Sequence, residues 1–269
     1  MIGWRARLGV ILPSVNTTTE SEFYQCLPEG VTAHFTRMEF KETTPAYYER
    51  MIEDVPAGAR MLSHAGVDAM AFACTSGSLY GGLGYDQKII AKIKEQSDVP
   101  ASTTATAVIE AFRMLGITRV SVATPYEDWV NELERRFFEG SGVKVIKMKG
   151  LGCTGIDVCE VHPETLYRFA KAQDDKESQA LFLSCMGLRT LEVLPRLEQD
   201  LGKPVISSNQ VTLWKLFRLC GIPCSDIRRN FGSLFKTESQ GSDKMVQEPI
   251  GRSLRPNAPD AATVRSFAR

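Results

Sequence analysis

The sequence has no apolar run near the length of a membrane span. A transmembrane helix needs about 20 consecutive apolar residues, and every hydrophobic segment of the 269-residue chain is shorter. The first seven residues lead directly into a strand pattern, without the apolar region of a signal peptide. We therefore expect a cytoplasmic protein without a membrane partner.

Neither sign of charge is in excess. Lysine plus arginine and aspartate plus glutamate each total 32, so the formal net charge is zero. Proteins that bind nucleic acid through its phosphates usually carry a basic surplus. We therefore expect no nucleic-acid partner, while a local site for a small anion stays compatible with this balance.

Several common catalytic motifs are missing. The chain has no Gly-x-Ser-x-Gly elbow, no Walker loop and no Gly-x-Gly-x-x-Gly after its first strand pattern. Histidine occurs only at His34, His64 and His162, each far in sequence from the cysteine motifs described below. We interpret these histidines as surface or packing residues.

The cysteines fit neither a disulfide scaffold nor a common zinc site. Seven cysteines are an odd number for this chain length and indicate a reducing compartment. Five residues separate Cys153 from Cys159, three separate Cys220 from Cys224, and neither spacing matches a zinc knuckle. We expect no metal site.

Three short motifs recur in the same order in the two halves of the chain. Each half has a strand pattern that ends in proline, and 61 and 60 residues later a cysteine ends an apolar run and begins a small-residue turn. The recurrence predicts two related lobes with a cleft between them. The matching pairs are residues 8–13 with 120–125, the turn at Cys74 with the turn at Cys185, and residues 98–104 with 202–208.

Apolar β-rich runs alternate with helical patterns, which predicts an α/β fold of two pseudo-symmetric lobes, each with a mostly parallel sheet flanked by helices. We place the lobes at residues 1–116 and 117–236, with the last helices free to cross over between them. Residues 237–269, rich in Ser, Gly, Pro and charge, are expected to form a flexible tail. The predicted strands are 7–13, 31–37, 69–73, 99–102, 119–124, 143–148, 180–184 and 204–207, and the predicted helices are 18–26, 46–64, 86–96, 105–115, 127–138, 164–172, 189–200 and 212–219.

Cys74 and Cys185 are the candidate catalytic residues. Each is expected at the carboxyl end of a buried strand, where open α/β sheets place their chemistry. Thr75, Ser76 and nearby glycines would bring hydroxyls and backbone amides close to a ligand, and such donors are expected to lower the pKa of the Cys74 thiol. Either cysteine alone could be an inert core residue, but their matching positions favour a catalytic pair.

Polar residues at two other strand ends are candidate substrate-binding groups. Ser14 and Asn16 precede a predicted helix, whose free N-terminal amides favour an anion, although Asn16 or Thr17 could serve only as a helix cap. Tyr126 follows the fifth strand and could donate a hydrogen bond to developing negative charge or pack with Trp129. The loop at residues 152–157 is expected to close over the cleft.

Four motifs together resemble the aspartate/glutamate racemase superfamily, in its maleate cis-trans isomerase and arylmalonate decarboxylase branch. The resemblance spans residues 5–236. It implies an active site in the cleft between the lobes, no metal or organic cofactor, a small carboxylate or dicarboxylate as substrate, and it allows a homo-oligomer. It also adds Met186 and Gly187 to the expected substrate-binding residues. The motifs are Pro13-Ser-Val-Asn-Thr-Thr, Ala73-Cys-Thr-Ser, Ala123-Thr-Pro-Tyr and Ser184-Cys-Met-Gly-Leu.

By this resemblance, Cys74 is the nucleophile that adds to an alkene and Cys185 is the acid or base, or the pair exchanges a proton on opposite faces of a carbon. Decarboxylases of the branch have glycine at the first position, which disfavours decarboxylation here. However, residues 151–155 and 205–208 look more like a decarboxylase, and residues 149–160 lack the asparagine of maleate isomerases. We therefore expect a two-cysteine isomerase or racemase, with an arylmalonate-type decarboxylase or a non-catalytic carboxylate-binding protein as alternatives.

Overall fold

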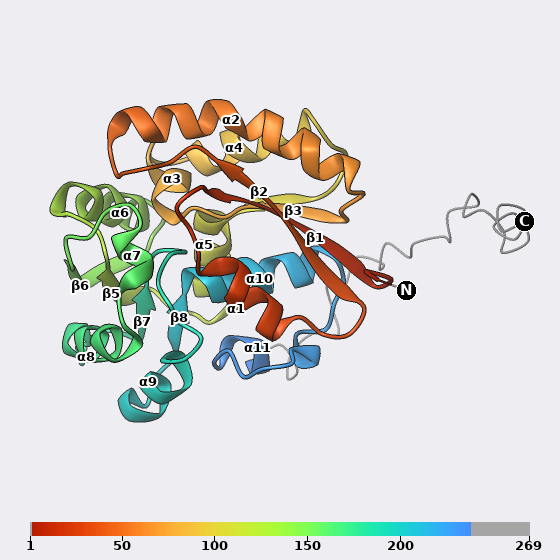
Figure 1. Cartoon of the computed structure of the whole chain (residues 1–269). Coiled ribbons are helices and arrows are strands. Elements are labelled where there is room, and N and C mark those ends of the chain that lie inside the picture. The colour runs from red at the N-terminus through yellow and green to blue at the C-terminus, as the bar shows by residue number, and fades with distance from the viewer. Residues whose placement is uncertain (1, 238–269) are drawn as a thin grey trace, which may run out of the picture.

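The computed structural model describes residues 2–237, so the expected tail lies outside the described residues apart from Thr237. Strands and helices alternate along both halves (Figure 1). The first half holds β1 (Ala6–Pro13), α1 (Thr19–Cys26), β2 (Val31–Met38), α2 (Pro45–His64), β3 (Ala69–Phe72), α3 (Thr75–Leu79), α4 (Tyr85–Lys94), β4 (Ala101–Thr103) and α5 (Thr104–Met114). The second holds β5 (Arg119–Thr124), α6 (Asp128–Gly140), β6 (Lys144–Gly150), α7 (Asp157–Glu160), α8 (Pro163–Gln173), β7 (Ala180–Leu183), α9 (Leu194–Leu201), β8 (Val205–Ser207), α10 (Ser208–Leu219), the 3-10 turn η1 (Cys224–Asp226) and α11 (Leu234–Thr237).

The strands form two four-stranded parallel sheets with the same topology. Their orders are β2-β1-β3-β4 and β6-β5-β7-β8. The inner strands β1, β3, β5 and β7 are almost fully buried, as expected for parallel strands covered by helices on both faces, whereas the edge strands β2 and β6 are partly exposed. The predicted α/β class with two pseudo-symmetric lobes is confirmed.

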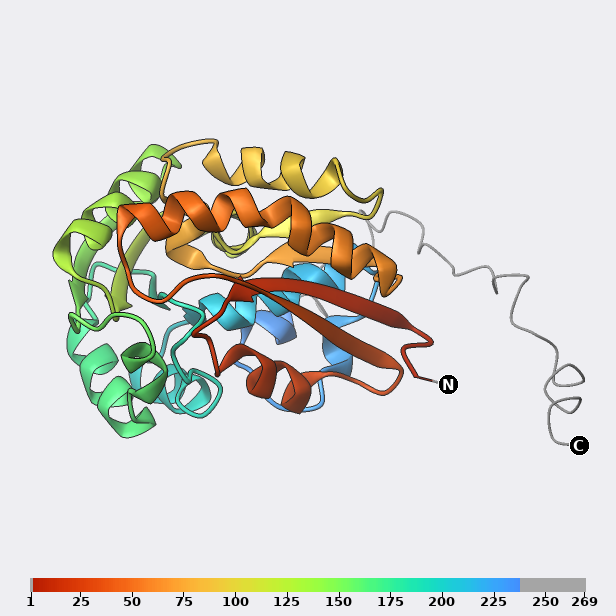
Figure 2. The same ribbon diagram turned by 45° about the horizontal axis from the view of Figure 1, so that its top comes forward.

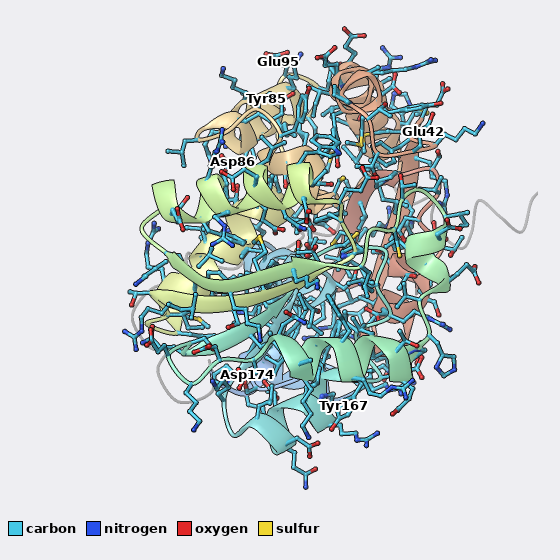
Figure 3. The ribbon with its side chains drawn as sticks, turned by 90° about the vertical axis from the view of Figure 1, so that its left-hand side faces the viewer. Glu42, Tyr85, Asp86, Glu95, Tyr167 and Asp174 are labelled. Atoms are coloured by element: carbon cyan, nitrogen blue, oxygen red, sulfur yellow. The ribbon has the colours of Figure 1, made fainter. Side chains whose placement is uncertain are left out.

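Helices cover both faces of each sheet. In the first lobe α2 and α4 pack on one face, while α1 lies on the other (Figures 1 and 2). In the second lobe α6 packs beside β6, and α8 and α9 pack on strands of the same sheet. Figure 3, viewed from the second lobe, shows Tyr85 of α4 and Tyr167 of α8 at opposite ends of the molecule.

The last helix of each half packs across the lobe boundary. The ring of Phe112 on α5 lies 5.7 Å from those of Phe138 and Phe182, both in the second lobe. Conversely, α10 packs against α5 and against strands β3 and β4 of the first sheet. This exchange buries apolar surface between the lobes, and the boundary at residue 116 stays a prediction.

Several segments differ from the sequence-based expectation: the short elements α7, η1 and α11 were not predicted, and two further differences bear on the site. Residues 75–79, expected as a turn, form the short helix α3 because the sulfur of Cys74 accepts a hydrogen bond from the Gly77 amide at 3.3 Å and caps the first turn. Helix α9 begins at Leu194 rather than Arg189. The preceding residues are held by tertiary hydrogen bonds, including one from the Leu191 amide to the Glu22 carboxylate at 2.7 Å.

Candidate active site

A cavity of about 450 Å³, including its open mouth, lies between the two lobes. Both candidate cysteines line it, Cys74 from the first lobe and Cys185 from the second. Five of the expected substrate-binding residues also line it, and they are Asn16, Ser76, Tyr126, Met186 and Gly187. The structure therefore brings together side chains from four separate strand ends.

Cys74 follows β3 and is buried, with 6% of its surface exposed. Its sulfur accepts the hydrogen bond from the Gly77 amide and lies 3.9 Å from the hydroxyl of Ser76. Burial nevertheless raises the pKa of the thiol to about 11, because desolvation of the thiolate outweighs these donors. The donors act in the expected direction, but the expectation of a lowered pKa for the Cys74 thiol is wrong.

Cys185 follows β7 with a backbone φ of 114°, and it is the only non-glycine residue with positive φ within residues 2–237. An L-residue adopts this conformation only when its surroundings enforce it. Its sulfur accepts a hydrogen bond from the Gly187 amide at 3.4 Å. Burial raises the pKa of the thiol to about 12, although the Gly187 amide and the Tyr126 hydroxyl act to lower it. For both cysteines, burial favours the thiol over the thiolate.

Tyr126 follows β5, and its side chain is buried. Its hydroxyl makes no hydrogen bond of ordinary geometry within residues 2–237, although it lies near enough to the Cys185 thiol to lower the pKa of that thiol. Burial raises the pKa of Tyr126 well above the usual value, and the nearby thiol of Cys185 adds to that shift. A neutral phenol that lines the cavity without a partner is available to donate a hydrogen bond to a ligand.

Two expected binding residues, Ser14 and Thr75, do not line the cavity. The Ser14 hydroxyl accepts a hydrogen bond from the Phe40 amide at 3.0 Å and donates to the Phe40 carbonyl at 3.1 Å, so it ties the end of β1 to the segment after β2. The Thr75 hydroxyl donates to Ser208 at 2.8 Å. Both hydroxyls are used to hold the protein together.

Asn16 lines the cavity and also binds amides at the start of helix α1. Its side-chain oxygen accepts hydrogen bonds from the amides of Thr18 and Thr19, each at 2.9 Å, and its amide nitrogen donates to the Thr19 hydroxyl at 2.9 Å. Glu20, in the first turn of the same helix, pairs with Arg37 at 3.0 Å. The N-cap residue of α1 is Thr18, so Asn16 acts from two residues before it, by accepting from the amides at the start of the helix. Its position in the cavity wall leaves a second role open.

The expected covering loop at residues 152–157 meets the first lobe over the cavity. The amide of Thr43 donates to the hydroxyl of Thr154 at 2.8 Å. Gly155 has a φ of 56°, and a Cβ at this position would lie 2.5 Å from the carbonyl oxygen of Lys41. Glycine is thus required both for the backbone conformation and for this close approach.

Several lining residues were not predicted from the sequence, because they lie on segments between the motifs. Phe40, Thr43, Val158 and Cys159 line the cavity. Beside it, the buried Tyr48 of α2 stacks on Tyr80 with ring centroids 4.9 Å apart. One wall of the cavity is therefore largely apolar.

The cavity carries no positive charge of its own, since no lysine or arginine is among the residues that line it. An anion would have to be held by neutral donors such as Ser76 and Tyr126. Within residues 2–237, no three histidine, cysteine, aspartate or glutamate side chains are grouped as a metal site requires. In the same part of the chain, no helix has the length and apolar character to cross a membrane.

Comparison with known proteins gives relatives of two activities. The sequence pattern of the arylmalonate decarboxylase family matches residues 8–232. An arylmalonate decarboxylase from Bordetella bronchiseptica is 34% identical over 197 residues, which cover 71% of this chain and 81% of the relative. A maleate isomerase from Geobacillus stearothermophilus is 27% identical over 227 residues, which cover 79% of this chain and 90% of the relative.

Solved structures of the same two kinds of enzyme superpose on this chain. A liganded double mutant of arylmalonate decarboxylase superposes with a TM-score of 0.81 at 29% identity, covering 86% of this chain and 99% of that one. A variant of the maleate isomerase from Pseudomonas putida S16 with maleate superposes with a TM-score of 0.80 at 27% identity, covering 86% and 97%. These relatives are enzymes, which sets aside the non-catalytic alternative. The chain is an enzyme of the arylmalonate decarboxylase family, in the branch of the aspartate/glutamate racemase superfamily that also holds the maleate isomerases.

Proposed function

We propose that this enzyme is a cofactor-independent isomerase or racemase that uses Cys74 and Cys185 on a small carboxylate or dicarboxylate. The observation that carries the proposal is that the two thiols line one cavity from opposite lobes. A planar reacting carbon between them would present one face to each sulfur. A racemase removes a proton from one face of a carbon and returns one to the other face, so it needs a group on each side that can give or take a proton.

For racemisation, the thiolate of one cysteine removes the proton next to the substrate carboxylate. The electron pair of the broken C–H bond moves into the carboxylate and forms an enediolate. The thiol of the other cysteine then delivers its proton to the opposite face, and the electron pair returns to carbon. The two cysteines end with their protonation states exchanged, and the reverse reaction restores them.

For cis-trans isomerisation, the Cys74 thiolate adds to one alkene carbon of an unsaturated diacid. The displaced electron pair takes the proton of the Cys185 thiol at the neighbouring carbon. The new C–C single bond rotates, Cys185 removes the proton again, and the C–S bond breaks with return of its electron pair to Cys74. Maleate is the substrate named for the isomerase relatives.

Both routes place extra negative charge beside a carboxylate, and neutral donors must stabilise it. We assign this role to the hydroxyls of Ser76 and Tyr126, with Asn16, Met186 and Gly187 shaping the wall. By analogy with oxyanion holes, each such donor is worth about 2.7 to 4 kcal/mol in the transition state. The Gly77 and Gly187 amides would stabilise whichever thiolate forms.

A decarboxylase of a disubstituted malonate is the second candidate. The apolar wall formed by Phe40 and Val158 and the identity to an arylmalonate decarboxylase favour it. In that reaction the C–C bond to one carboxylate breaks, carbon dioxide leaves, and the electron pair stays on the α-carbon. The Cys185 thiol then supplies the proton, so Cys74 would have no required role.

Proton NMR of the purified enzyme in D2O separates these reactions. The substrates are maleate, single enantiomers of 2-aryl and 2-alkyl carboxylic acids, and arylmalonates. We expect fumarate from maleate, or deuterium exchange at the α-carbon with loss of optical activity. We also expect both Cys74→Ala and Cys185→Ala to remove the reaction. Release of carbon dioxide from an arylmalonate without either of these changes would favour the second candidate instead.

A further inference from the structure

The segment that carries Cys185 is fixed at both ends by buried carboxyl groups. We define the Cys185 loop as residues 184–191, between β7 and the turn before α9. It contains the positive φ of Cys185 and presents Met186 and Gly187 to the cavity. Its two ends, at Ser184 and at Thr190 with Leu191, bond to glutamates from two different lobes.

Glu134 lies on α6 and has 0% of its surface exposed. One of its oxygens accepts a hydrogen bond from the Ser184 hydroxyl at 2.6 Å, immediately before Cys185. The other oxygen has no hydrogen-bonding partner among the described residues. None of the ion pairs found within residues 2–237 includes Glu134.

Glu22 lies on α1 of the first lobe and has 4% of its surface exposed. Its carboxyl accepts hydrogen bonds from the Leu191 amide at 2.7 Å and from the Thr190 hydroxyl at 3.1 Å. It therefore reaches across the lobe boundary to the far end of the Cys185 loop. Like Glu134, it has no cationic partner among the ion pairs of the described chain.

The two glutamates occupy equivalent positions in the internal repeat. Glu22 is nine residues after Pro13, and Glu134 is nine residues after Pro125. A buried carboxyl without a cation is costly for a fold. Two of them at one offset, bonded to the two ends of one loop, indicate a common role beyond packing.

We infer that Glu22 and Glu134 are positioning residues that hold the Cys185 loop in the conformation needed for reaction at the Cys185 sulfur. A strained residue persists only when its neighbours over-determine it. The middle of the loop is held by hydrogen bonds from Thr18, Thr19 and Asn209 to the carbonyls of residues 186–188, and by Ser208, which accepts from the Cys185 amide. The hydrogen bonds of the two glutamates add the constraint at its two ends, on either side of Cys185. Without them the loop relaxes and the sulfur leaves the position opposite Cys74.

Cys74 provides an internal reference in the same molecule. Its φ of −144° is ordinary extended backbone. The α3 segment after it is tied by the Ser78 hydroxyl, which donates to the Thr75 carbonyl at 2.9 Å and accepts from the Ala105 amide at 3.1 Å. Loss of either glutamate is therefore expected to act on Cys185 and to leave Cys74 nearly unchanged.

The test is the alkylation rate of each cysteine by iodoacetamide, followed peptide by peptide with mass spectrometry. In Glu134→Ala and Glu22→Ala we expect Cys185 to react at least fivefold faster than in the wild type, because a relaxed loop exposes the thiol. Cys74 is expected to change less than twofold. Glu134→Gln and Glu22→Gln keep an acceptor oxygen and should return Cys185 to within twofold of the wild-type rate.

Ser184→Ala removes the hydrogen bond to Glu134 without altering α6, and it decides the test for Glu134 if Glu134→Ala does not fold. Thr190→Val, which removes the hydroxyl that donates to Glu22, serves in the same way for Glu22. The matched control is Glu132→Ala, because Glu132 lies on the same helix but is half exposed and pairs with Arg136 at 2.8 Å. This control is expected to change neither cysteine. Equal changes at both cysteines, no change at Cys185, or glutamine variants as reactive as the alanine variants would overturn the inference.

The inference rests on the proposed function only in treating Cys185 as catalytic, and alkylation needs no substrate. An altered ratio of the two rates, combined with no turnover of any acid tested, would leave the inference intact while the proposed function fails. With a substrate in hand, the alanine variants should lose at least tenfold in kcat and the glutamine variants should recover most of it.

Discussion

The hydroxyl of Ser208 accepts a hydrogen bond from the backbone amide of Cys185 at 3.0 Å. The same oxygen accepts a second hydrogen bond from the side chain of Thr75 at 2.8 Å. Ser208 is the first residue of α10, which packs against the first sheet. One buried hydroxyl thus connects the residue after Cys74 with the strained backbone of Cys185. The relative position of the two sulfurs depends on it.

We expect Ser208→Ala to destabilise the protein by about 1 to 3 kcal/mol, because it leaves the buried Cys185 amide and the Thr75 hydroxyl without a partner. Urea unfolding followed by circular dichroism measures this change. Ser208→Thr keeps the hydroxyl and should lose less. Ser63→Ala, at a partly exposed serine near the end of α2, is the control and should cost less than about 0.5 kcal/mol. Equal losses in the free energy of unfolding for Ser208→Ala and Ser63→Ala would show that Ser208 does not connect Thr75 with Cys185 in this way.

The raised pKa values of the two thiols predict a steep pH dependence of alkylation. The values are about 11 for Cys74 and about 12 for Cys185, and the thiolate is the reactive form. Between pH 7 and pH 10 the rate at each cysteine should rise about tenfold per pH unit, as expected for a group below its pKa. A plateau near pH 8 at either cysteine would show that its thiolate is stabilised and contradict this prediction.

Glu134 should make the stability of the protein fall at alkaline pH. Burial raises its pKa from 4.5 to about 8, so the folded protein favours the neutral carboxyl. Its contribution is fully present below pH 4.5 and is lost as pH rises through about 8. The tyrosines nearest to it, Tyr126 and Tyr48, have pKa values raised well above 10 and stay neutral in this range.

Glu134→Gln keeps the side chain neutral at every pH. Relative to the wild type, this variant should gain about 1 to 3 kcal/mol of stability between pH 5 and pH 9. Thermal unfolding at a series of pH values measures the difference. Glu22, whose pKa is raised to about 7, contributes equally to both proteins and cancels in the comparison. A pH-independent difference would mean that Glu134 is already ionised at pH 5.

Most of the fold could be predicted from the sequence, because its inner strands are continuous apolar runs separated by helical patterns. The two cysteines could be located from the repeat alone. Helix α3 was missed because Thr75, Ser76 and Gly77 are weak helix formers, and cysteine is not among the residues usually expected to cap a helix. The direction of the Cys74 pKa shift was wrong because the sequence shows nearby donors but not the depth of burial.

The parts of the site that were missed depend on how segments between the motifs fold over the cavity. Ser14 and Thr75 have the right chemistry, but their hydroxyls are used by Phe40 and Ser208. No sequence pattern reveals such a choice of partner. Glu22 and Glu134 did leave a signal, since both lie at the same offset in the repeat, and a search of the repeat for matching charged residues would have found them.

The lack of a side chain at Gly187 leaves room in the cavity for the substrate. A Cβ at this position would lie 2.9 Å from a methyl carbon of Val158, and both residues line the cavity. Gly187→Ala should therefore narrow the cavity and raise KM at least tenfold for any substrate with a bulky group, with a smaller effect on kcat. Steady-state kinetics with a small and a large substrate measures the change. Equal effects on both substrates would mean that Gly187 acts on the Cys185 loop rather than on the available space.

Cys74→Gly separates the two candidate reactions most directly. A two-cysteine isomerase or racemase loses one of its two proton-transfer groups or its nucleophile, and activity should fall by about 100- to 10,000-fold. A decarboxylase needs only the proton of Cys185 and should keep most of its rate. The variant also removes the acceptor of the Gly77 amide, which costs about 1 kcal/mol of stability, so rates are compared per folded molecule. Cys26→Ala, at a buried cysteine that does not line the cavity, controls for the loss of a buried thiol. Retained isomerisation in Cys74→Gly would remove Cys74 from the mechanism and, with it, the two-cysteine proposal.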